Sequence, residues 1–124
     1  MKPKRPVNLD IGTIDLPLAA LTSITHRISG VALFAATAVL LYLLNQSLVS
    51  EQGFLYVRSI IGSTPVKLVL WVILSALGYH MVAGCKHLLM DIGIGETKAG
   101  GPIGARITIG LSVVLSLVVE VWLW

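Results

Sequence analysis

Three long apolar runs constrain the fold of this 124-residue chain more than any other feature; they cover residues 24–48, 66–90 and 107–124. Each run is close to the ~20 residues that a helix needs to cross a hydrocarbon core of about 30 Å. Lipid offers the backbone no hydrogen bonds, so only helices and closed barrels span it. The runs lack the polar and apolar alternation of barrel strands. The sequence therefore predicts an all-α membrane protein with three transmembrane helices.

The composition agrees with a membrane protein, because 56% of the residues are hydrophobic and 12% are charged. Soluble domains average about 25% charged residues. The sequence shows no basic patch with interleaved aromatic residues of the kind that binds nucleic acid. The single cysteine, Cys85, excludes an internal disulfide. Residues 1–124 are therefore predicted to form one membrane-anchor domain with an N-terminal arm over residues 1–22, which is too long before the first apolar run for a cleavable signal peptide.

Lys and Arg residues are unevenly distributed between the two sides of the predicted spans. Seven lie in or near the arm and the second connection, and two lie on the other side: Lys2, Lys4, Arg5, Arg27, Lys86, Lys98 and Arg106 against Arg58 and Lys67. Cytoplasmic loops carry the excess of basic residues. We therefore expect a cytoplasmic N-terminus, a periplasmic C-terminus and an inner-membrane location.

The segments outside the spans contain several signals that break or begin helices. Pro17 argues against a continuous helix in the arm, and Pro65 suits the first turn of the second span. Residues 54–61 are expected to form a short surface helix, and the glycine-rich residues 91–106 a flexible, turn-rich loop.

The second span ends with four residues that share one helical face: His80, Gly84, His87 and Asp91. Ionisable groups inside a membrane are costly and usually face a partner, a cofactor or water. Gly84 removes a side chain where a flat macrocycle could lie against the backbone. The pattern indicates a site on this face, although interhelical hydrogen bonds would also explain the two histidines.

Depth distinguishes the three histidines. His80 lies about 15 Å from the cytoplasmic end of its helix and His87 about one turn from it, whereas His26 is expected in the first turn of the first span, near the level of His87. His80, in an apolar setting, suits an axial ligand of haem iron. A haem held within the chain would pair His26 with His87, or His26 with His80 only by tilting. A second ligand from another subunit fits more readily.

Ser23 and Arg27 lie one turn apart at the start of the first span. A hydroxyl and a guanidinium together can donate hydrogen bonds to a carbonyl oxygen, such as that of a quinone. The alternative interpretation is a helix cap at Ser23 and a positively charged interfacial anchor at Arg27.

Small residues in the first two spans favour close packing between membrane helices. They are Gly30, Ala32, Ala35, Ala36, Ser75, Ala76 and Gly78. Three helices use such faces only partly, so we expect association with another membrane subunit. Ordinary lipid-facing small residues remain the alternative.

Three segments together resemble the cytochrome b subunit of bacterial succinate dehydrogenase. They are Arg5-Pro-Val-Asn-Leu-Asp10, Ser23-Ile-Thr-His-Arg-Ile-Ser-Gly30 and His80-x3-Gly84-x2-His87-Leu-Leu-Met-Asp91. The resemblance covers about three quarters of the chain, and the third span carries no motif. It implies a membrane anchor of respiratory complex II, in which this chain forms half of a heterodimeric bundle with a second three-helix subunit and shares one haem b with it.

The resemblance also implies roles for individual residues. His80 matches the axial ligand of the haem iron, with the other ligand on the partner. Ser23 and Arg27 match residues of the ubiquinone site beside the iron–sulfur subunit. His26, Arg27 and His87 fall near the haem propionates. Asp91 matches a position facing the soluble subunits, and Glu120 has no assigned role.

By this resemblance, electrons from succinate would pass from the flavoprotein subunit through the iron–sulfur subunit to ubiquinone at the cytoplasmic face. The chain alone would perform no complete reaction and would act as a subunit of succinate dehydrogenase. Three alternatives remain open at this stage. They are a fumarate reductase-type quinol enzyme anchor, a small transport or assembly protein with a polar proton path, and a purely structural anchor.

Overall fold

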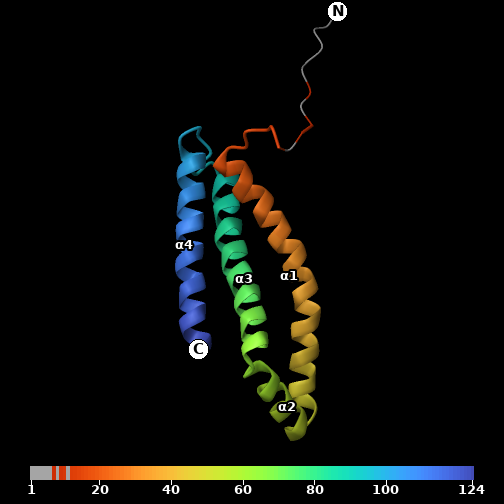
Figure 1. The fold of residues 1–124 in the computed structure, drawn as a ribbon. Coiled ribbons are helices and arrows are strands. Elements are labelled where there is room, and N and C mark those ends of the chain that lie inside the picture. The colour runs from red at the N-terminus through yellow and green to blue at the C-terminus, as the bar shows by residue number, and fades with distance from the viewer. Residues whose placement is uncertain (1–6, 8, 11) are drawn as a thin grey trace, which may run out of the picture.

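The computed structural model describes residues 7, 9, 10 and 12–124, and this part of the chain forms four helices (Figure 1). They are α1 (Leu18–Val49), α2 (Glu51–Ile61), α3 (Thr64–Asp91) and α4 (Gly100–Leu123). Helices α1, α3 and α4 are long and apolar enough to cross a membrane. The predicted all-α class with three membrane-spanning helices is confirmed.

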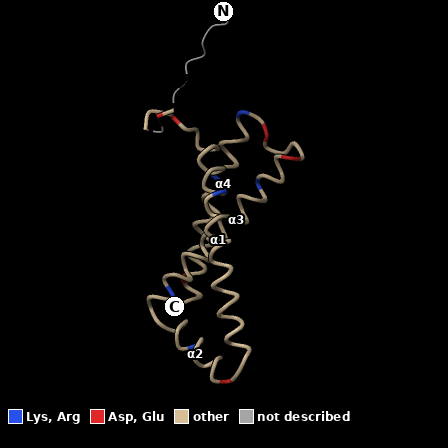
Figure 2. The backbone as a smooth tube through the Cα atoms, turned by 90° about the vertical axis from the view of Figure 1, so that its right-hand side faces the viewer, with Lys and Arg blue, Asp and Glu red and all other residues tan. Residues whose placement is uncertain are grey.

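Helix α3 lies between α1 and α4, and each of the three contacts the other two (Figure 1). We call the end where α1 and α4 begin and α3 ends the proximal end, and the end that holds α2 the distal end. Charged residues gather toward these two ends and leave the middle of the long helices uncharged (Figure 2). Lys2, Lys4 and Arg5, which contribute to the predicted orientation, lie outside the described residues, as do Pro6 and Asn8 of the 5–10 motif.

Helix α1 begins earlier than the apolar run predicts. Its first residue is Leu18, so the last part of the expected arm is helical. Pro17 precedes the first turn, and its carbonyl oxygen accepts the N–H groups of Ala20 at 2.9 Å and Leu21 at 3.1 Å. Proline is tolerated at a helix start because its missing N–H would have no partner there. Pro17 therefore starts the helix that it was expected to interrupt.

Helix α2 confirms the short helix expected over residues 54–61 and begins slightly earlier. The Ser50 hydroxyl oxygen accepts the N–H of Gly53 at 3.0 Å and so caps its first turn. A Cβ atom on Gly53 would collide with the carbonyl oxygen of Gln46. The tight turn between α1 and α2 therefore requires glycine. Pro65 lies in the first turn of α3, as predicted.

Helix α3 ends in a Schellman motif centred on Gly93. The N–H of Gly93 donates to the carbonyl of Met90, and the N–H of Ile94 donates to that of Leu89, both at 2.9 Å. Gly93 has a φ of 84°, in the left-handed region that side chains disfavour. The end of the second span is thus set by its own local sequence.

Helix α4 begins at Gly100, so the expected loop over residues 91–106 is shorter than predicted. The hydroxyl oxygen of Thr97 accepts the N–H of Gly100 at 2.9 Å and helps to cap the helix. A Cβ on Gly104 would lie 3.4 Å from the side chain of Lys86. Packing on α3 therefore outweighs the low helix propensity of these glycines.

The interior of the bundle is small. Among the described residues, the buried apolar side chains are those of Val57, Ala83 and Ala105, whereas most large apolar side chains are exposed. The helices therefore bury small residues against one another and leave wide apolar surfaces for lipid or another subunit.

Candidate functional site: a histidine cluster between two spans

The three histidines form one cluster between α1 and α3. The ring of His26 stacks on the ring of His80, with centroids 4.1 Å apart and planes inclined by 18°. The ring of His87 lies 5.2 Å from that of His26, at an angle of 45°. His26, from α1, therefore lies against both histidines of α3, and all three rings are half-buried.

The prediction that His26 lies in the first turn of its helix is wrong, although its ring lies near that of His87, as expected. Because α1 begins at Leu18, His26 lies in the third turn of the helix, deep enough to stack on His80. Two rings in face-to-face contact leave no gap for a macrocycle between them. The pairing of His26 and His80 on one iron, which the sequence left open, is therefore excluded in this arrangement.

Two groups of α1 lie within hydrogen-bond distance of Nδ1 of His80. The hydroxyl oxygen of Ser29 lies 2.9 Å from Nδ1, and the backbone carbonyl oxygen of His26 lies 3.2 Å from it. The Ser29 hydroxyl donates to the same carbonyl at 2.8 Å. Because that carbonyl only accepts, its contact favours the tautomer of His80 that carries the ring proton on Nδ1. In that tautomer Nε2 has no proton, as metal binding by a histidine requires.

Two glycines make room for the histidine rings. A Cβ on Gly30 would lie 3.1 Å from Cε1 of His80, closer than such contacts normally are. A Cβ on Gly84 would lie 3.4 Å from Nε2 of His26. The ring that lies against Gly84 is thus the imidazole of His26, where the sequence suggested space for a macrocycle. Glycine is needed at residue 30 for the close approach of α1 and α3.

The imidazole of His80 fits the requirements of a haem ligand better than that of His26. Nε2 of His80 has no hydrogen bond to any described residue, whereas Nε2 of His26 is fully buried without a partner. A ligand histidine commonly donates its other N–H to a carbonyl or a similar acceptor, as Nδ1 of His80 does. The described residues contain no group of three or more His, Cys, Asp or Glu side chains suited to a metal ion.

A polar junction beside the cluster joins the helices at the proximal end. The hydroxyl of Tyr79 donates to the carbonyl of Thr22 at 2.7 Å, and Nζ of Lys86 donates to the hydroxyl oxygen of Thr22 at 3.3 Å. Sequence reasoning missed these contacts and the role of Ser29. The spacing of Ser29, three residues after His26, was the available signal, since such residues are neighbours on a helix.

Ser23 and Arg27 lie on α1 near the cluster. Ser23 is half-buried and Arg27 is exposed, and no hydrogen bond or ion pair joins either side chain to another described residue. Within the described residues, both side chains therefore keep hydrogen-bond donors that a ligand can use. Asp91 is exposed at the last residue of α3.

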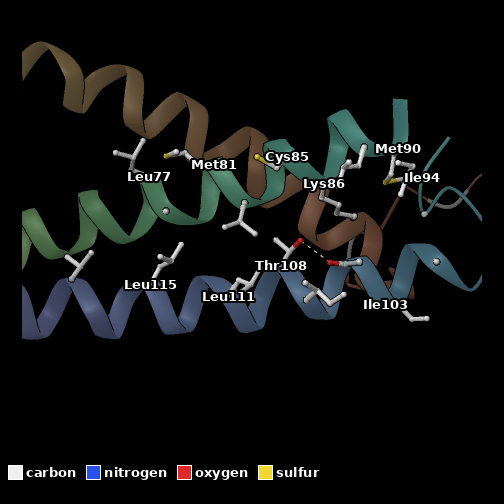
Figure 3. A pocket seen from close by; sticks show the side chains of 18 of the residues that line it. Leu77, Met81, Cys85, Lys86, Met90, Ile94, Ile103, Thr108, Leu111 and Leu115 are labelled. Atoms are coloured by element: carbon white, nitrogen blue, oxygen red, sulfur yellow. Dashed lines mark hydrogen bonds between the residues drawn. The ribbon is translucent and has the colours of Figure 1, made fainter. Parts of the chain in front are cut away.

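An apolar groove of about 850 Å³ lies between α3 and α4, apart from these residues (Figure 3). The labelled residues of its wall are Leu77, Met81, Cys85, Lys86, Met90, Ile94, Ile103, Thr108, Leu111 and Leu115. None of the predicted site residues lines it, and the sequence analysis did not anticipate it. The hydroxyl of Thr108 is already bonded to the carbonyl of Gly104 at 2.9 Å. The groove thus offers volume but few polar groups to orient a ligand.

Comparison with known proteins agrees with this architecture. Residues 1–119 match the family described as the succinate dehydrogenase/fumarate reductase transmembrane subunit. The chain is 37% identical to the succinate dehydrogenase cytochrome b556 subunit of Coxiella burnetii over the full length of both. It is 34% identical to the Paracoccus denitrificans subunit of the same name, over 91% of this chain and 87% of the relative. The Rickettsia felis subunit is 32% identical over 98% of this chain and 91% of the relative. The chain therefore belongs to the family of succinate dehydrogenase and fumarate reductase transmembrane subunits.

Proposed function

We propose that this chain is the haem b-binding membrane anchor of a succinate:ubiquinone oxidoreductase and contributes to its ubiquinone site. Its relatives carry the name cytochrome b556 subunit, and its three apolar helices suit a membrane anchor. The single observation that carries the proposal is the hydrogen bonding of His80. Nδ1 is held by Ser29 and by the carbonyl of His26, which leaves Nε2 free to bind iron.

Bound haem supplies a centre that gains and loses one electron, with a potential that depends on its axial ligands. Nε2 of His80 would provide one axial bond. His87 lies on the same helix about 10 Å from His80, too far to bind the opposite face of the same iron. The ring of His26 is stacked against that of His80, so it lies on the same side of the iron as His80. The other axial ligand would therefore come from a second three-helix anchor subunit, which would also cover part of the exposed apolar surface.

Ser23 and Arg27 would hold ubiquinone at the proximal end. The Ser23 hydroxyl and the Arg27 guanidinium donate hydrogen bonds, and the guanidinium stabilises the negative charge that develops on a quinone oxygen during reduction. The absence of competing bonds to described residues supports this role. His26, Arg27 and His87 would lie near the haem propionates, where hydrogen-bond donors suit carboxylates.

The proximal end would face the cytoplasm of the bacterial cell, because Arg27, Lys98 and Arg106 all lie toward it. The iron–sulfur and flavoprotein subunits would then dock at this end, with the exposed Asp91 facing them. The C-terminus would lie at the periplasmic side of the inner membrane.

The decisive experiment is a reduced-minus-oxidised visible spectrum of the purified complex in wild type, His80→Ala and Met81→Ala. Met81 is the matched control, because it neighbours His80 but lines the groove on another side of α3. We expect a low-spin b-type spectrum that His80→Ala abolishes or strongly alters and that Met81→Ala preserves. An intact wild-type complex without haem, or an unchanged His80→Ala spectrum, would refute the assignment of the ligand.

A fumarate reductase-type quinol enzyme is the second candidate, because the matched family includes both enzymes. The two differ in the direction of electron flow, which depends on the redox centres of the whole complex. Comparing succinate oxidation with fumarate reduction by the purified complex would decide between them.

A further inference from the structure

We propose that Ser29 is a positioning residue for His80 and that its hydroxyl sets the tautomer and the donor strength of that imidazole. The inference deepens the proposed function and rests on it, because it concerns the axial ligand of the haem. Ser29 itself would touch neither haem nor quinone and would act through His80.

Ser29 is buried. It is one of the few buried polar residues of the described chain, with 7% of its surface exposed, although it lies on a helix that is mostly exposed. A buried hydroxyl needs hydrogen-bond partners, and Ser29 has two of them on different elements. One is the carbonyl of His26 on its own helix, and the other is Nδ1 of His80 on α3.

The hydrogen bonds of Ser29 have defined donors and acceptors. The serine hydrogen points to the His26 carbonyl at 2.8 Å, so the serine oxygen can only accept from Nδ1 at 2.9 Å. The carbonyl, 3.2 Å from Nδ1, favours the same protonated Nδ1. Gly30, the next residue, allows the ring to approach the backbone of α1, with Cε1 the nearest atom. Helix α1 therefore fixes both the tautomer and the orientation of the His80 ring.

The bond from Nδ1 of His80 to Ser29 would also affect a bound iron. An imidazole that donates a hydrogen bond from Nδ1 becomes a stronger base at Nε2, so it binds the iron more tightly. The ferric ion carries more charge than the ferrous ion and gains more from a stronger donor. The bond between Ser29 and His80 would therefore lower the haem midpoint potential, and its removal would raise it.

Ser47 supplies a matched control on the same helix. Its hydroxyl donates to the carbonyl of Leu44, three residues earlier, at 2.7 Å. This bond has the same spacing as the bond from Ser29 to His26, but Ser47 makes no interhelical bond to another described residue. Changing Ser47 to alanine tests the loss of a helical serine without the loss of a bond to His80.

The test uses the intact purified complex with Ser29→Ala, Ser29→Thr and Ser47→Ala, and measures haem content and the midpoint potential by redox titration. For Ser29→Ala we expect the affinity for the ferric form of the haem to fall about tenfold relative to that for the ferrous form. This corresponds to an upward shift of the midpoint potential by about 59 mV for one electron. Ser29→Thr retains a hydroxyl that can reach the preceding turn, so it should keep a potential close to wild type. Ser47→Ala should leave the potential unchanged.

A wild-type potential in Ser29→Ala with full haem content would overturn the inference, and so would an equal shift in Ser47→Ala. If Ser29→Ala loses its haem, recovery in Ser29→Thr supports the role of the hydroxyl, and failure to recover contradicts it. Failure of the proposed function looks different: the wild-type complex would lack haem, or His80→Ala would keep an unaltered spectrum. Either of those results would remove the basis for both proposals.

Discussion

The two sides of α3 near the proximal end are built from different chemistry. The side toward α1 carries His80, Gly84 and His87, and there a stacked ring and directed hydrogen bonds close the interface. The side toward α4 carries Met81 and Cys85 and opens into an apolar groove of about 850 Å³. The residues come from the same few turns of one helix, and their angular offset alone separates them.

The comparison shows why cavity size is a poor guide to function in this chain. A large apolar pocket with a few convergent polar groups is the usual first hypothesis for a binding site. Here the groove has few polar groups, and Lys86 and Thr108 in its wall already have hydrogen-bond partners, whereas the histidines lie in a packed interface on the other side of α3. A surface that borders lipid can be apolar without binding a specific ligand, whereas orienting an imidazole requires directional bonds.

Among the substitutions that test the difference between the two sides of α3, Gly30→Val is expected to have the largest effect. A Cβ at residue 30 already lies 3.1 Å from Cε1 of His80, and a branched side chain would push the ring away from α1. Overpacking of this kind costs about 1–3 kcal/mol. We expect most of the haem to be lost, measured as the b-type absorbance per purified complex.

Gly110→Val is the control for this substitution, because a Cβ on Gly110 meets nothing within 4 Å. It should retain its haem and its thermal stability. Equal haem loss in both glycine variants would show that the interface between α1 and α3 is not specifically required.

A smaller and more selective effect is expected from Ser23→Ala and Arg27→Leu. Each removes a donor that the described chain leaves unpaired, and loss of one such donor to a developing negative charge costs about tenfold or more in rate. Ubiquinone reduction should fall while succinate oxidation by an artificial soluble acceptor stays intact. Parallel assays with the two acceptors measure the difference.

Arg106→Leu serves as the control, since Arg106 is also an exposed arginine near the proximal end but lies on α4. It should not affect ubiquinone reduction. An equal loss with both acceptors in the Ser23 or Arg27 variants would point to failed assembly and contradict a quinone-site role.

The smallest effect is expected from Cys85→Leu, which adds volume on the groove side of α3. Cys85 is exposed, so its replacement should change stability by no more than about 0.5 kcal/mol. Haem spectrum and quinone reduction should match wild type. A clear loss of either would show that the groove takes part in function and would remove the contrast between the two sides of α3.

Much of the architecture was readable from the sequence because lipid imposes a strong constraint. Spans of about 20 apolar residues can bury their backbone polar groups only in helices, so the three spans followed from hydropathy. The helical period likewise placed His80, Gly84 and His87 on one face. Pro65 marked a helix start because proline suits the first turn.

Helix ends and interhelical contacts were harder to predict from the sequence. The apolar runs used for the prediction did not include the first turns of α1 and α4, which begin at Leu18 and Gly100. These helix starts are held by contacts with α3, such as the bond from Tyr79 to the carbonyl of Thr22 and the packing of Gly104 on Lys86, which a linear pattern does not contain. The helical turn that holds His26 was misjudged for this reason, and its stacking on His80 was not predicted.

The number of spans, the helical class and the face of α3 that carries the histidines follow from the amino-acid order, because the bilayer and the helical period act on local residues. The tertiary structure decided that Ser29 meets Nδ1 of His80, that His26 stacks on the same ring, and that a groove opens beside Cys85. Those features depend on the register between helices far apart in the chain. Register is set by close contacts at small residues such as Gly30, and only the packed bundle brings those residues together.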